Sequence, residues 1–194
     1  LLKNETLDRE QRREYLNIIE EESLRLSDMA TNVLNLAKVE NQQILSNVSA
    51  FNLSEQVRNC FLQLEDKWSG KNLDADFDFG EVQICGNEEL LRQVWLNLLD
   101  NAVKYSDREG NIEWKFSGYG KGVKIVLSNT TDGVPEGELS RLFERFYRLD
   151  SSRSRQTGGH GVGLSMAKSI VEAHKGKITA KSPDGKLIVF TIIF

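Results

Sequence analysis

Cysteine and histidine are scarce in this sequence, whose 194 residues include only two of each. Cys60 and Cys85 match no metal-site spacing and are too few for a disulfide framework, so a reducing compartment is indicated. No apolar run approaches the roughly 20 residues that span a bilayer. A signal peptide and an initiator Met are also missing, so we expect the chain to be a piece of a larger protein.

An excess of basic residues is absent too. The 25 Lys and Arg residues face 29 Asp and Glu residues, for a net charge of −4. Nucleic acid is therefore not expected as a partner, because binding phosphate backbones requires clustered positive charge. With 39% hydrophobic residues the chain can form a core and is not disordered. Its length predicts one domain and a smaller additional element.

Residues 8–41 contain neither glycine nor proline and predict one long helix. Asp8 and Gln11 have the spacing of a capping box. At about 45 Å, the helix is too long for one small domain to cover. Its heptad seam therefore predicts pairing with another helix, although a helix lying on its own domain is the alternative. Leu1 and Leu2 are expected to end a preceding helix. The seam comprises Leu16, Ile19, Ser23, Leu26, Ala30, Val33 and Ala37, flanked by Ile18, Met29 and Leu36.

The rest of the chain predicts an α+β fold, in which helices cover one face of a mixed, mostly antiparallel sheet. The expected elements are a connector at 42–53, a helix at 54–69 with Ser54 as N-cap, strands at 73–79 and 82–85, a helix from the cap Asn87 to about Lys104, a hairpin of 112–117 and 123–128, a loop-rich stretch at 130–163, a helix at 162–174, and a hairpin of 177–181 and 186–194.

A polar stripe interrupts the expected helix at 87–104. Gln93, Asn97, Asn101 and Lys104 follow one another at spacings that place them on one side. Asparagine is a poor residue for a helix interior, so the stripe indicates a site, with solvated side chains as the alternative. An amide oxygen is a hard, neutral ligand for Mg²⁺, and a lysine one turn later can meet phosphate.

Glycines gather before the next helix, in the segment TGGHGVGL at 157–164. Such a loop lets backbone N–H groups approach phosphates, although a flexible hinge is an equal alternative. It is neither a Walker loop nor a dinucleotide fingerprint. Upstream, an aromatic pair within Phe143, Phe146 and Tyr147 is expected to anchor the polar segment 149–158, which resembles a nucleotide lid.

Together these segments resemble the sensor histidine kinases of bacterial two-component systems, within the GHKL ATPase superfamily. QVWLNLLDNAVKYS (93–106) resembles the N box, LFERFYR (142–148) the F box, and TGGHGVGLSMAKSIVEAHKGKI (157–178) the second glycine box with its helix. Residues 7–41 resemble the second helix of the dimerisation and phosphotransfer hairpin. The resemblance implies a partial hairpin at 1–44 and an ATP-binding catalytic domain of the histidine-kinase type at 45–194.

The resemblance also implies roles for individual residues. Asn97, Lys104 and Arg148 would be catalytic, with Arg148 reaching the γ-phosphate. Asn97 would line the triphosphate, and its place is that of a catalytic Glu in hydrolytic relatives, so slow ATP hydrolysis is expected. The residues implied to bind Mg²⁺ and ATP are Asn101 as the metal ligand, Asn97, Lys104, Tyr105, Asn129, Gly133, Arg148, Gly159, Gly161, Gly163 and Leu164, with Thr191 in the adenine network.

The first glycine box departs from the family pattern of Asp-x-Gly-x-Gly. Asn129 stands at the position of the Asp that accepts a hydrogen bond from adenine, Thr131 replaces the first glycine, and Gly133 remains. Asp132 is a minor alternative acceptor. A neutral amide accepts a weaker hydrogen bond than a carboxylate, so this change puts the affinity for ATP in question.

Neither His160 nor His174 matches the family's phospho-acceptor, which is therefore expected upstream of this chain. Contact within the loop and charge at a helix C-terminus are their expected roles. The resemblance implies transfer of the γ-phosphoryl group from Mg·ATP to that histidine, relay to a response regulator receiver domain, a homodimer formed through the N-terminal helix, and a cytosolic place in a membrane-anchored parent. The alternatives are a degenerate, non-catalytic dimerising module and a GHKL serine kinase.

Overall fold

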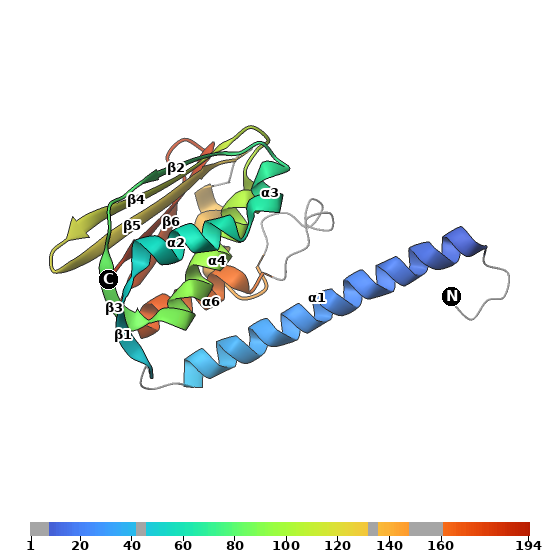
Figure 1. Cartoon of the computed structure of the whole chain (residues 1–194), viewed down its shortest axis with the longest axis horizontal. Helices are drawn as coiled ribbons and strands as arrows, with labels where there is room; N and C mark the ends of the chain where they lie inside the picture. Colours follow the sequence, from blue (N-terminus) through green and yellow to red (C-terminus); the bar gives the residue numbers. More distant parts are fainter. Residues whose placement is uncertain (1–7, 42–45, 132–135, 148–160) are drawn as a thin grey trace.

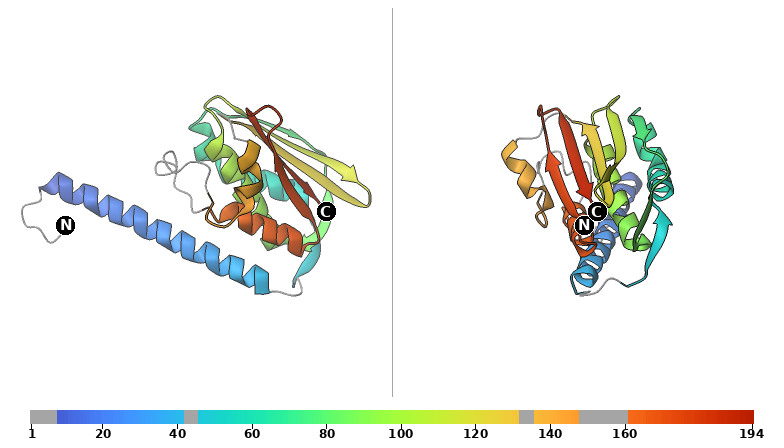
Figure 2. Two further views of the ribbon diagram at one scale, coloured as in Figure 1. Left: turned by 180° about the vertical axis from the view of Figure 1, so that it is seen from behind. Right: turned by 90° about the vertical axis from the view of Figure 1, so that its left-hand side faces the viewer.

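A long helix projects from an α/β body in the computed structural model, which describes residues 8–41, 46–131, 136–147 and 161–194 (Figures 1 and 2). This helix, α1, spans Arg9–Asn41 as predicted. Its capping box is confirmed: the Gln11 N–H donates to Asp8 Oδ1 at 2.8 Å, and the Asp8 N–H donates to Gln11 Oε1 at 3.3 Å. None of the described helices combines the length and apolarity required to cross a membrane.

The body is built on a five-stranded sheet in the order β2-β4-β5-β7-β6. Only β2 and β4 pair in parallel, so the prediction of a mixed, mostly antiparallel sheet is confirmed. The helices α2, α4 and α6 lie together on one side of this sheet (Figure 1). The strands are β2 (Asp74–Asp78), β4 (Asn111–Tyr119), β5 (Gly122–Thr130), β6 (Lys177–Lys181) and β7 (Leu187–Ile193).

A second, two-stranded sheet lies within the segment expected to be a connector. It pairs β1 (Val48–Asn52) antiparallel with β3 (Gln83–Asn87). The first three residues of β1 are exposed, so the strand shows no clear alternation of buried and exposed residues. The connector prediction was therefore wrong because β1 is defined by its pairing rather than by hydrophobic periodicity.

The single helix expected at 54–69 is two helices, α2 (Leu53–Leu62) and α3 (Glu65–Ser69). The N-cap is Asn52 rather than Ser54, since Asn52 Oδ1 accepts from the Glu55 N–H at 3.1 Å. The Ser54 hydroxyl instead donates to the Gly80 carbonyl at 2.7 Å and accepts from the Val82 N–H at 2.9 Å. Ser54 therefore fastens α2 to the loop before β3.

Helix α4 (Glu88–Tyr105) forms the centre of the helical layer. As predicted, Asn87 caps it by accepting from the Leu90 N–H at 3.0 Å. The buried side of α4 packs in one core with residues of the sheet such as Trp114 and Phe190, and burying such large side chains is the main stabilising contribution to the fold. The buried residues of α4 are Leu91, Val94, Trp95, Leu98, Leu99, Ala102 and Val103.

The C-terminal part adds a 3₁₀ helix, η1 (Glu136–Phe143), and α6 (Gly163–Ala173) before the β6–β7 hairpin. The turn between these strands is stabilised by Asp184, whose Oδ1 accepts from the Lys186 N–H at 2.9 Å. Helix α6 lies beside α4 and also contacts α1. The start of α6 is therefore placed against the middle of α4.

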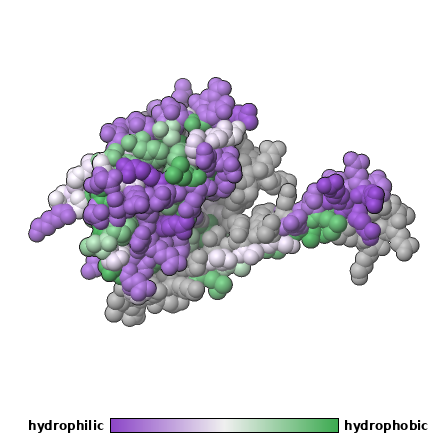
Figure 3. Space-filling model, viewed as in Figure 1, coloured by the Kyte–Doolittle hydropathy of each residue, from purple (hydrophilic) through white to green (hydrophobic). Residues whose placement is uncertain are grey.

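The projecting part of α1 exposes apolar side chains of the predicted seam. Leu16 is 52% exposed and Leu26 is 65% exposed. Figure 3 shows hydrophobic atoms interrupting the otherwise hydrophilic surface of this part of the helix. Such residues gathered along one helix are typical of a surface that pairs with another helix.

Candidate functional site

The polar stripe of α4 faces away from the buried side of the helix. Asn97, Asn101 and Lys104 are each half-buried, between the exposed surface and the core. The Asn97 Nδ2 group donates to the Gln93 carbonyl at 2.7 Å, which fixes the orientation of the amide. Gln93 Oε1 is buried without a hydrogen-bond partner among the described residues, an arrangement that a bound polar group or water would complete.

The start of α6 packs directly against Asn97. A Cβ atom on Gly163 would lie 2.6 Å from Asn97 Oδ1, so a larger residue would displace the amide. Val162 occupies the N-cap position, and no side chain of the described residues caps the helix there. The first N–H groups of an α-helix have no partners within the helix, so this terminus is suited to bind an anion beside Asn97.

The segment after η1 joins the same region through Gly161. The Phe146 N–H donates to the Gly161 carbonyl at 2.9 Å. Gly161 has φ of +65°, and a Cβ atom there would lie 2.7 Å from the Tyr147 carbonyl oxygen. Both the left-handed backbone and the close approach therefore require glycine. The predicted F box and glycine box meet at this point, next to the α6 terminus.

The segment that the aromatic residues were expected to anchor, 149–158, lies outside the described residues, so only the surroundings of the rings are described. Phe143 contacts Phe190 of β7 at a ring distance of 6.3 Å, and Tyr147 is half-buried with the Arg141 guanidinium 4.2 Å from its ring centre. Phe146 is 57% exposed and has φ of +63°, so its ring is not part of the core. Phe143 and Tyr147 supply the packing instead.

Lys104 and Tyr105 lie together at the C-terminal end of α4. The Lys104 ammonium is 5.3 Å from the centre of the Tyr105 ring, a distance at which a cation is attracted to an aromatic face. Tyr105 is 37% exposed. An aromatic ring and a positive charge are therefore presented side by side at the end of the polar stripe.

Asn129 and Thr131 occupy the end of β5. Asn129 is 1% exposed, and its Nδ2 group donates to the Thr130 carbonyl at 3.0 Å. This bond uses an N–H of the amide, whose Oδ1 has the chemistry of a hydrogen-bond acceptor. Thr131 is also buried, and its backbone N–H donates to the Lys186 carbonyl at 2.9 Å. Thr131 thus continues the pairing with β7 where the family pattern has a flexible glycine.

Thr191 does not join this group. In the sheet Asn129 is opposite Ile188, whereas Thr191 is opposite Val126. Buried and half-buried residues alternate along β7, and Thr191 lies on the opposite face from the buried Ile188, Phe190 and Ile192. Because side chains alternate between sheet faces, Thr191 projects from the face opposite to that of Asn129, and its place in the adenine network stays a prediction.

Four further residues of the sequence prediction, Gly133, Arg148, Gly159 and His160, lie outside the described residues. Leu164 is within the first turn of α6 and is buried, with 9% exposure. It therefore contributes apolar packing next to Gly163.

His174 has a role that the sequence did not indicate. Its Nε2 accepts from the Asn87 N–H at 3.0 Å, and its Nδ1 lies 2.8 Å from the Ile170 carbonyl, which makes Nδ1–H the donor there. Burial lowers the pKa of His174, opposed by the bond to Ile170. The expected positive charge at the end of α6 was wrong, since the neutral ring links this end to the start of α4. Gly86 leaves room for the ring.

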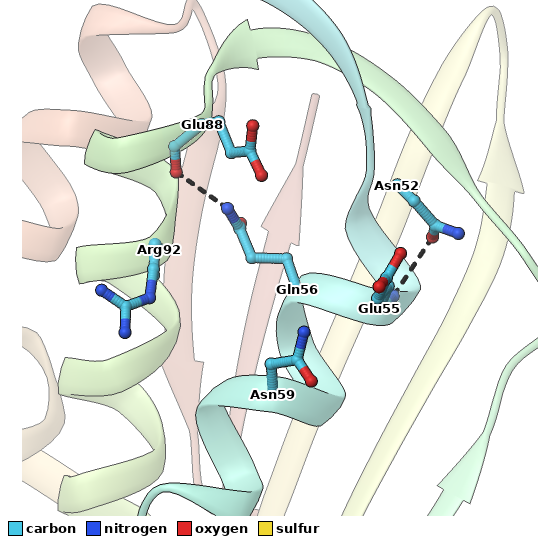
Figure 4. A pocket seen from close by; sticks show the side chains of 6 residues that line it. All are labelled: Asn52, Glu55, Gln56, Asn59, Glu88 and Arg92. Atoms are coloured by element: carbon cyan, nitrogen blue, oxygen red, sulfur yellow. Dashed lines mark hydrogen bonds between the residues drawn. The ribbon is translucent and has the colours of Figure 1, made fainter.

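A polar hollow of about 240 Å³ lies between the starts of α2 and α4 (Figure 4). Gln56 crosses it, donating to the Glu88 carbonyl at 2.8 Å and accepting from Trp95 Nε1 at 2.7 Å. Glu88 and Arg92 lie about 180° and 140° around α4 from Asn97, so the hollow is not part of the candidate site. Its lining residues are Asn52, Glu55, Gln56, Asn59, Glu88 and Arg92.

The family model described as histidine kinase-, DNA gyrase B-, and HSP90-like ATPase matches residues 86–194, which include all of α4, α6 and the main sheet except β2. The chain belongs to this ATPase family. Among curated relatives, the sensor histidine kinase CusS of Escherichia coli K12 is 33% identical over 168 residues, 87% of this chain and 35% of the relative. The histidine kinase ArlS of Staphylococcus aureus USA300 is 32% identical over 181 residues, 93% of this chain and 40% of the relative.

Solved structures show the same fold. The Acinetobacter baumannii histidine kinase AdeS matches with a TM-score of 0.75 and 24% identity, over 97% of this chain and 85% of that one. Full-length ShkA in complex with AMPPNP matches with a TM-score of 0.78 and 23% identity, over 99% of this chain and 40% of that one. Because CusS is a sensor histidine kinase and ArlS a signal transduction histidine-protein kinase, the predicted resemblance to sensor histidine kinases is confirmed. The chain spans well under half the length of these two curated relatives.

The residues of this histidine kinase-type ATPase domain fit Mg²⁺ and ATP. Gly163 lets the start of α6 lie directly against Asn97, the α6 terminus presents N–H groups, and Lys104 supplies a positive charge. Asn101 offers an amide oxygen, a ligand type that Mg²⁺ takes together with phosphate oxygens and water. When bound, Mg²⁺ would neutralise negative charge on the phosphates.

Proposed function

We propose that this chain is the catalytic part of a sensor histidine kinase that donates the γ-phosphoryl group of Mg·ATP to a histidine upstream of residue 1 in the parent protein. The observation that carries the proposal is the convergence of three segments. Asn97 of α4 lies against Gly163 of α6. The Phe146 N–H donates to the carbonyl of Gly161, which lies two residues before Gly163. This assembles an amide stripe, a helix N-terminus and an aromatic turn at one place.

In the reaction, a neutral imidazole nitrogen attacks the γ-phosphorus, a P–N bond forms, and the bond to the bridging oxygen of ADP breaks. Histidine needs no added base to act as a nucleophile near pH 7. The chain's own residues position the nucleotide and stabilise its negative charge. Asn97 and the α6 terminus would line the phosphates, Asn101 would hold the metal, and Lys104 would contact a phosphate. Arg148 is proposed to reach the γ-phosphate.

The phosphoryl group then passes to an Asp of a response regulator receiver domain. The histidine kinase ThkA has been solved in complex with the response regulator TrrA, and it matches this chain with a TM-score of 0.75 and 24% identity, over 99% of this chain and 54% of ThkA. The exposed leucines of α1 support a homodimer through residues 1–44, with 45–194 as the ATP-binding domain. The parent is proposed to carry this part in the cytosol.

The test is calorimetric titration of the chain with ATP in the presence of Mg²⁺. We expect saturable binding that Asn101→Ala weakens by at least about tenfold, since it removes the proposed metal ligand. Asn59→Ala is the matched control, because Asn59 is an exposed asparagine on α2, beside the separate hollow. Equal binding by both variants would contradict the assignment of Asn101.

One observation favours a second candidate, a dimerising module that binds nucleotide poorly. Thr131 is buried and paired with Lys186 where the family pattern has glycine, so the end of β5 is more rigid than that pattern implies. This candidate predicts no binding even at millimolar Mg·ATP. Acid-stable phosphate on a substrate protein would instead indicate the serine kinase alternative.

A further inference from the structure

The loop after α3 reaches the C-terminal end of α4 through one lysine. Lys71 Nζ donates to the Lys104 carbonyl at 2.7 Å and to the Ser106 carbonyl at 2.9 Å. The last carbonyls of a helix have no partners within the helix, and they carry its partial negative charge. An ammonium group held between two of them therefore determines how this end of α4 terminates.

The backbone around Lys71 is itself held in place. The Lys71 N–H donates to the Trp68 carbonyl at 3.2 Å, and the Lys71 carbonyl accepts from the Glu109 N–H at 3.0 Å. Beyond it, the Asp74 N–H at the start of β2 donates to the Gly110 carbonyl at 2.9 Å. The turn that follows α4 is thus bonded to residues 71–74, and the lysine is not a freely moving surface side chain.

Lys71 is half-buried, and burial lowers its pKa, while the Asp107 carboxylate nearby acts in the opposite direction. Its ammonium has therefore exchanged part of its hydration for the two carbonyl contacts. By contrast, Lys67 of α3 pairs with the Asp100 side chain of α4 while remaining 61% exposed. The two lysines contact the same helix, but only Lys71 binds its terminal backbone.

We propose that Lys71 is a positioning residue for nucleotide binding: it holds the last turn of α4 so that Lys104 and Tyr105 are aligned with the polar stripe. The carbonyl it binds belongs to Lys104 itself, and the second lies one residue beyond Tyr105. This inference rests on the proposed function. Asn97 and Asn101 lie one to two turns earlier in α4, so Lys71 acts mainly through Lys104 and Tyr105.

The test is a double-mutant cycle on the chain as it stands, with Mg·ATP affinity measured by calorimetry. Lys71→Met keeps the aliphatic stem and removes the donors. In the unsubstituted chain, we expect this change to weaken Mg·ATP binding by at least about threefold. In a Lys104→Met background it should have little further effect, because the effects of substitutions at coupled residues are not additive. Lys71→Arg, which keeps charge and donors, should restore most of the affinity. Lys67→Met is the matched control and should bind Mg·ATP as tightly as the unsubstituted chain does.

Hydrogen exchange supplies the second readout, and it does not depend on nucleotide. Lys71→Met should accelerate exchange of the amides of residues 103–106 relative to Lys67→Met. The inference is overturned if Lys71→Met leaves ATP affinity unchanged, or if it weakens binding equally with and without Lys104. If the unsubstituted chain does not bind Mg·ATP, the proposed function fails, and the inference fails with it. If the unsubstituted chain binds Mg·ATP and substitution of Lys71 does not change the affinity, only the inference is overturned and the proposed function stands.

Discussion

Amide side chains define the candidate site at the scale of single residues. Asn97 and Asn129 are each oriented by a bond from Nδ2 to a backbone carbonyl, at 2.7 Å and 3.0 Å. In both, the donor side of the amide is used within the protein. An amide oxygen accepts hydrogen bonds, so Asn129 is proposed as a neutral acceptor at the adenine end.

The first prediction concerns Asn129→Asp. A carboxylate accepts a stronger hydrogen bond from the adenine amino group, so ATP affinity should rise roughly fivefold, the equivalent of about 1 kcal/mol. The free energy of unfolding without nucleotide should fall by about 1–3 kcal/mol, because a buried charge replaces the bond to Thr130. Calorimetry and denaturant unfolding measure the two effects. Inosine triphosphate, which lacks the amino group, is the control ligand, and an equal gain for it would contradict the assignment.

The second prediction concerns pH and His174. In the unfolded chain its pKa is about 6.5, and burial lowers it in the folded protein. Below about pH 6.5 the unfolded chain therefore binds a proton that the folded protein does not, so the free energy of unfolding falls, by at most about 1.4 kcal/mol per pH unit.

His174→Gln should flatten this dependence between pH 5 and 6.5, as measured by urea unfolding at several pH values. His160→Gln is the control and should leave the dependence in place. A pH profile unchanged by His174→Gln would contradict the neutral bridge between α6 and α4.

At the scale of elements, the site depends on how the start of α6 meets the middle of α4. Gly163 and Asn97 approach so closely that their contact determines the distance between the helices. His174 joins the other end of α6 to the backbone at Asn87, where α4 begins. The two contacts fix both ends of α6 against α4, and with them the direction in which the α6 terminus points.

The third prediction is therefore that Gly163→Ala weakens nucleotide binding. The added methyl group would overlap Asn97 Oδ1 and force the helices apart, at a cost of about 1–3 kcal/mol in the free energy of unfolding. Mg·ATP affinity should fall by at least about tenfold. Gly118→Ala is the control, since a Cβ atom there meets nothing within 4 Å. If Gly163→Ala had the same stability and Mg·ATP affinity as the unsubstituted chain, the close approach of Gly163 to Asn97 would be unimportant.

The sequence predicted some elements well and others poorly, for physical reasons. Helix α4 has a strong apolar period and a capping asparagine at Asn87, so local information suffices. Strand β1 has neither, and only pairing with β3 defines it. The error over Ser54 arose because Asn52 is an equally good cap two residues earlier, and the bonds of Ser54 to Gly80 and Val82 are long-range.

The same limit applies to the site. The residue types of the stripe and of the glycine loop were visible in the sequence, because they are unusual for their elements. Lys71 was not, since its partners are 33 and 35 residues away and a single lysine has no distinguishing local pattern. The face on which Thr191 lies could not be predicted either, because it depends on register, which the sequence of β7 alone does not specify.

At the scale of the whole molecule, we propose different functions for the α/β body and α1. The body assembles the site between α4, α6 and the turn after η1, while α1 projects with its apolar seam exposed (Figure 1). A catalytic domain that presents a γ-phosphate without hydrolysing it needs a separate acceptor. The slow hydrolysis expected from the resemblance, which places Asn97 at the position of a catalytic Glu, would be consistent with that division. The chain alone should therefore bind ATP without rapid turnover.

The most direct test of this account uses the parent protein extended upstream to include the partner of α1. Incubated with ATP labelled at the γ-phosphate and Mg²⁺, it should acquire label that is stable to base and lost in acid, as phosphohistidine is. Asn101→Ala should abolish the labelling, and Asn59→Ala should leave it intact. Acid-stable label, or labelling that persists without Asn101, would contradict the account.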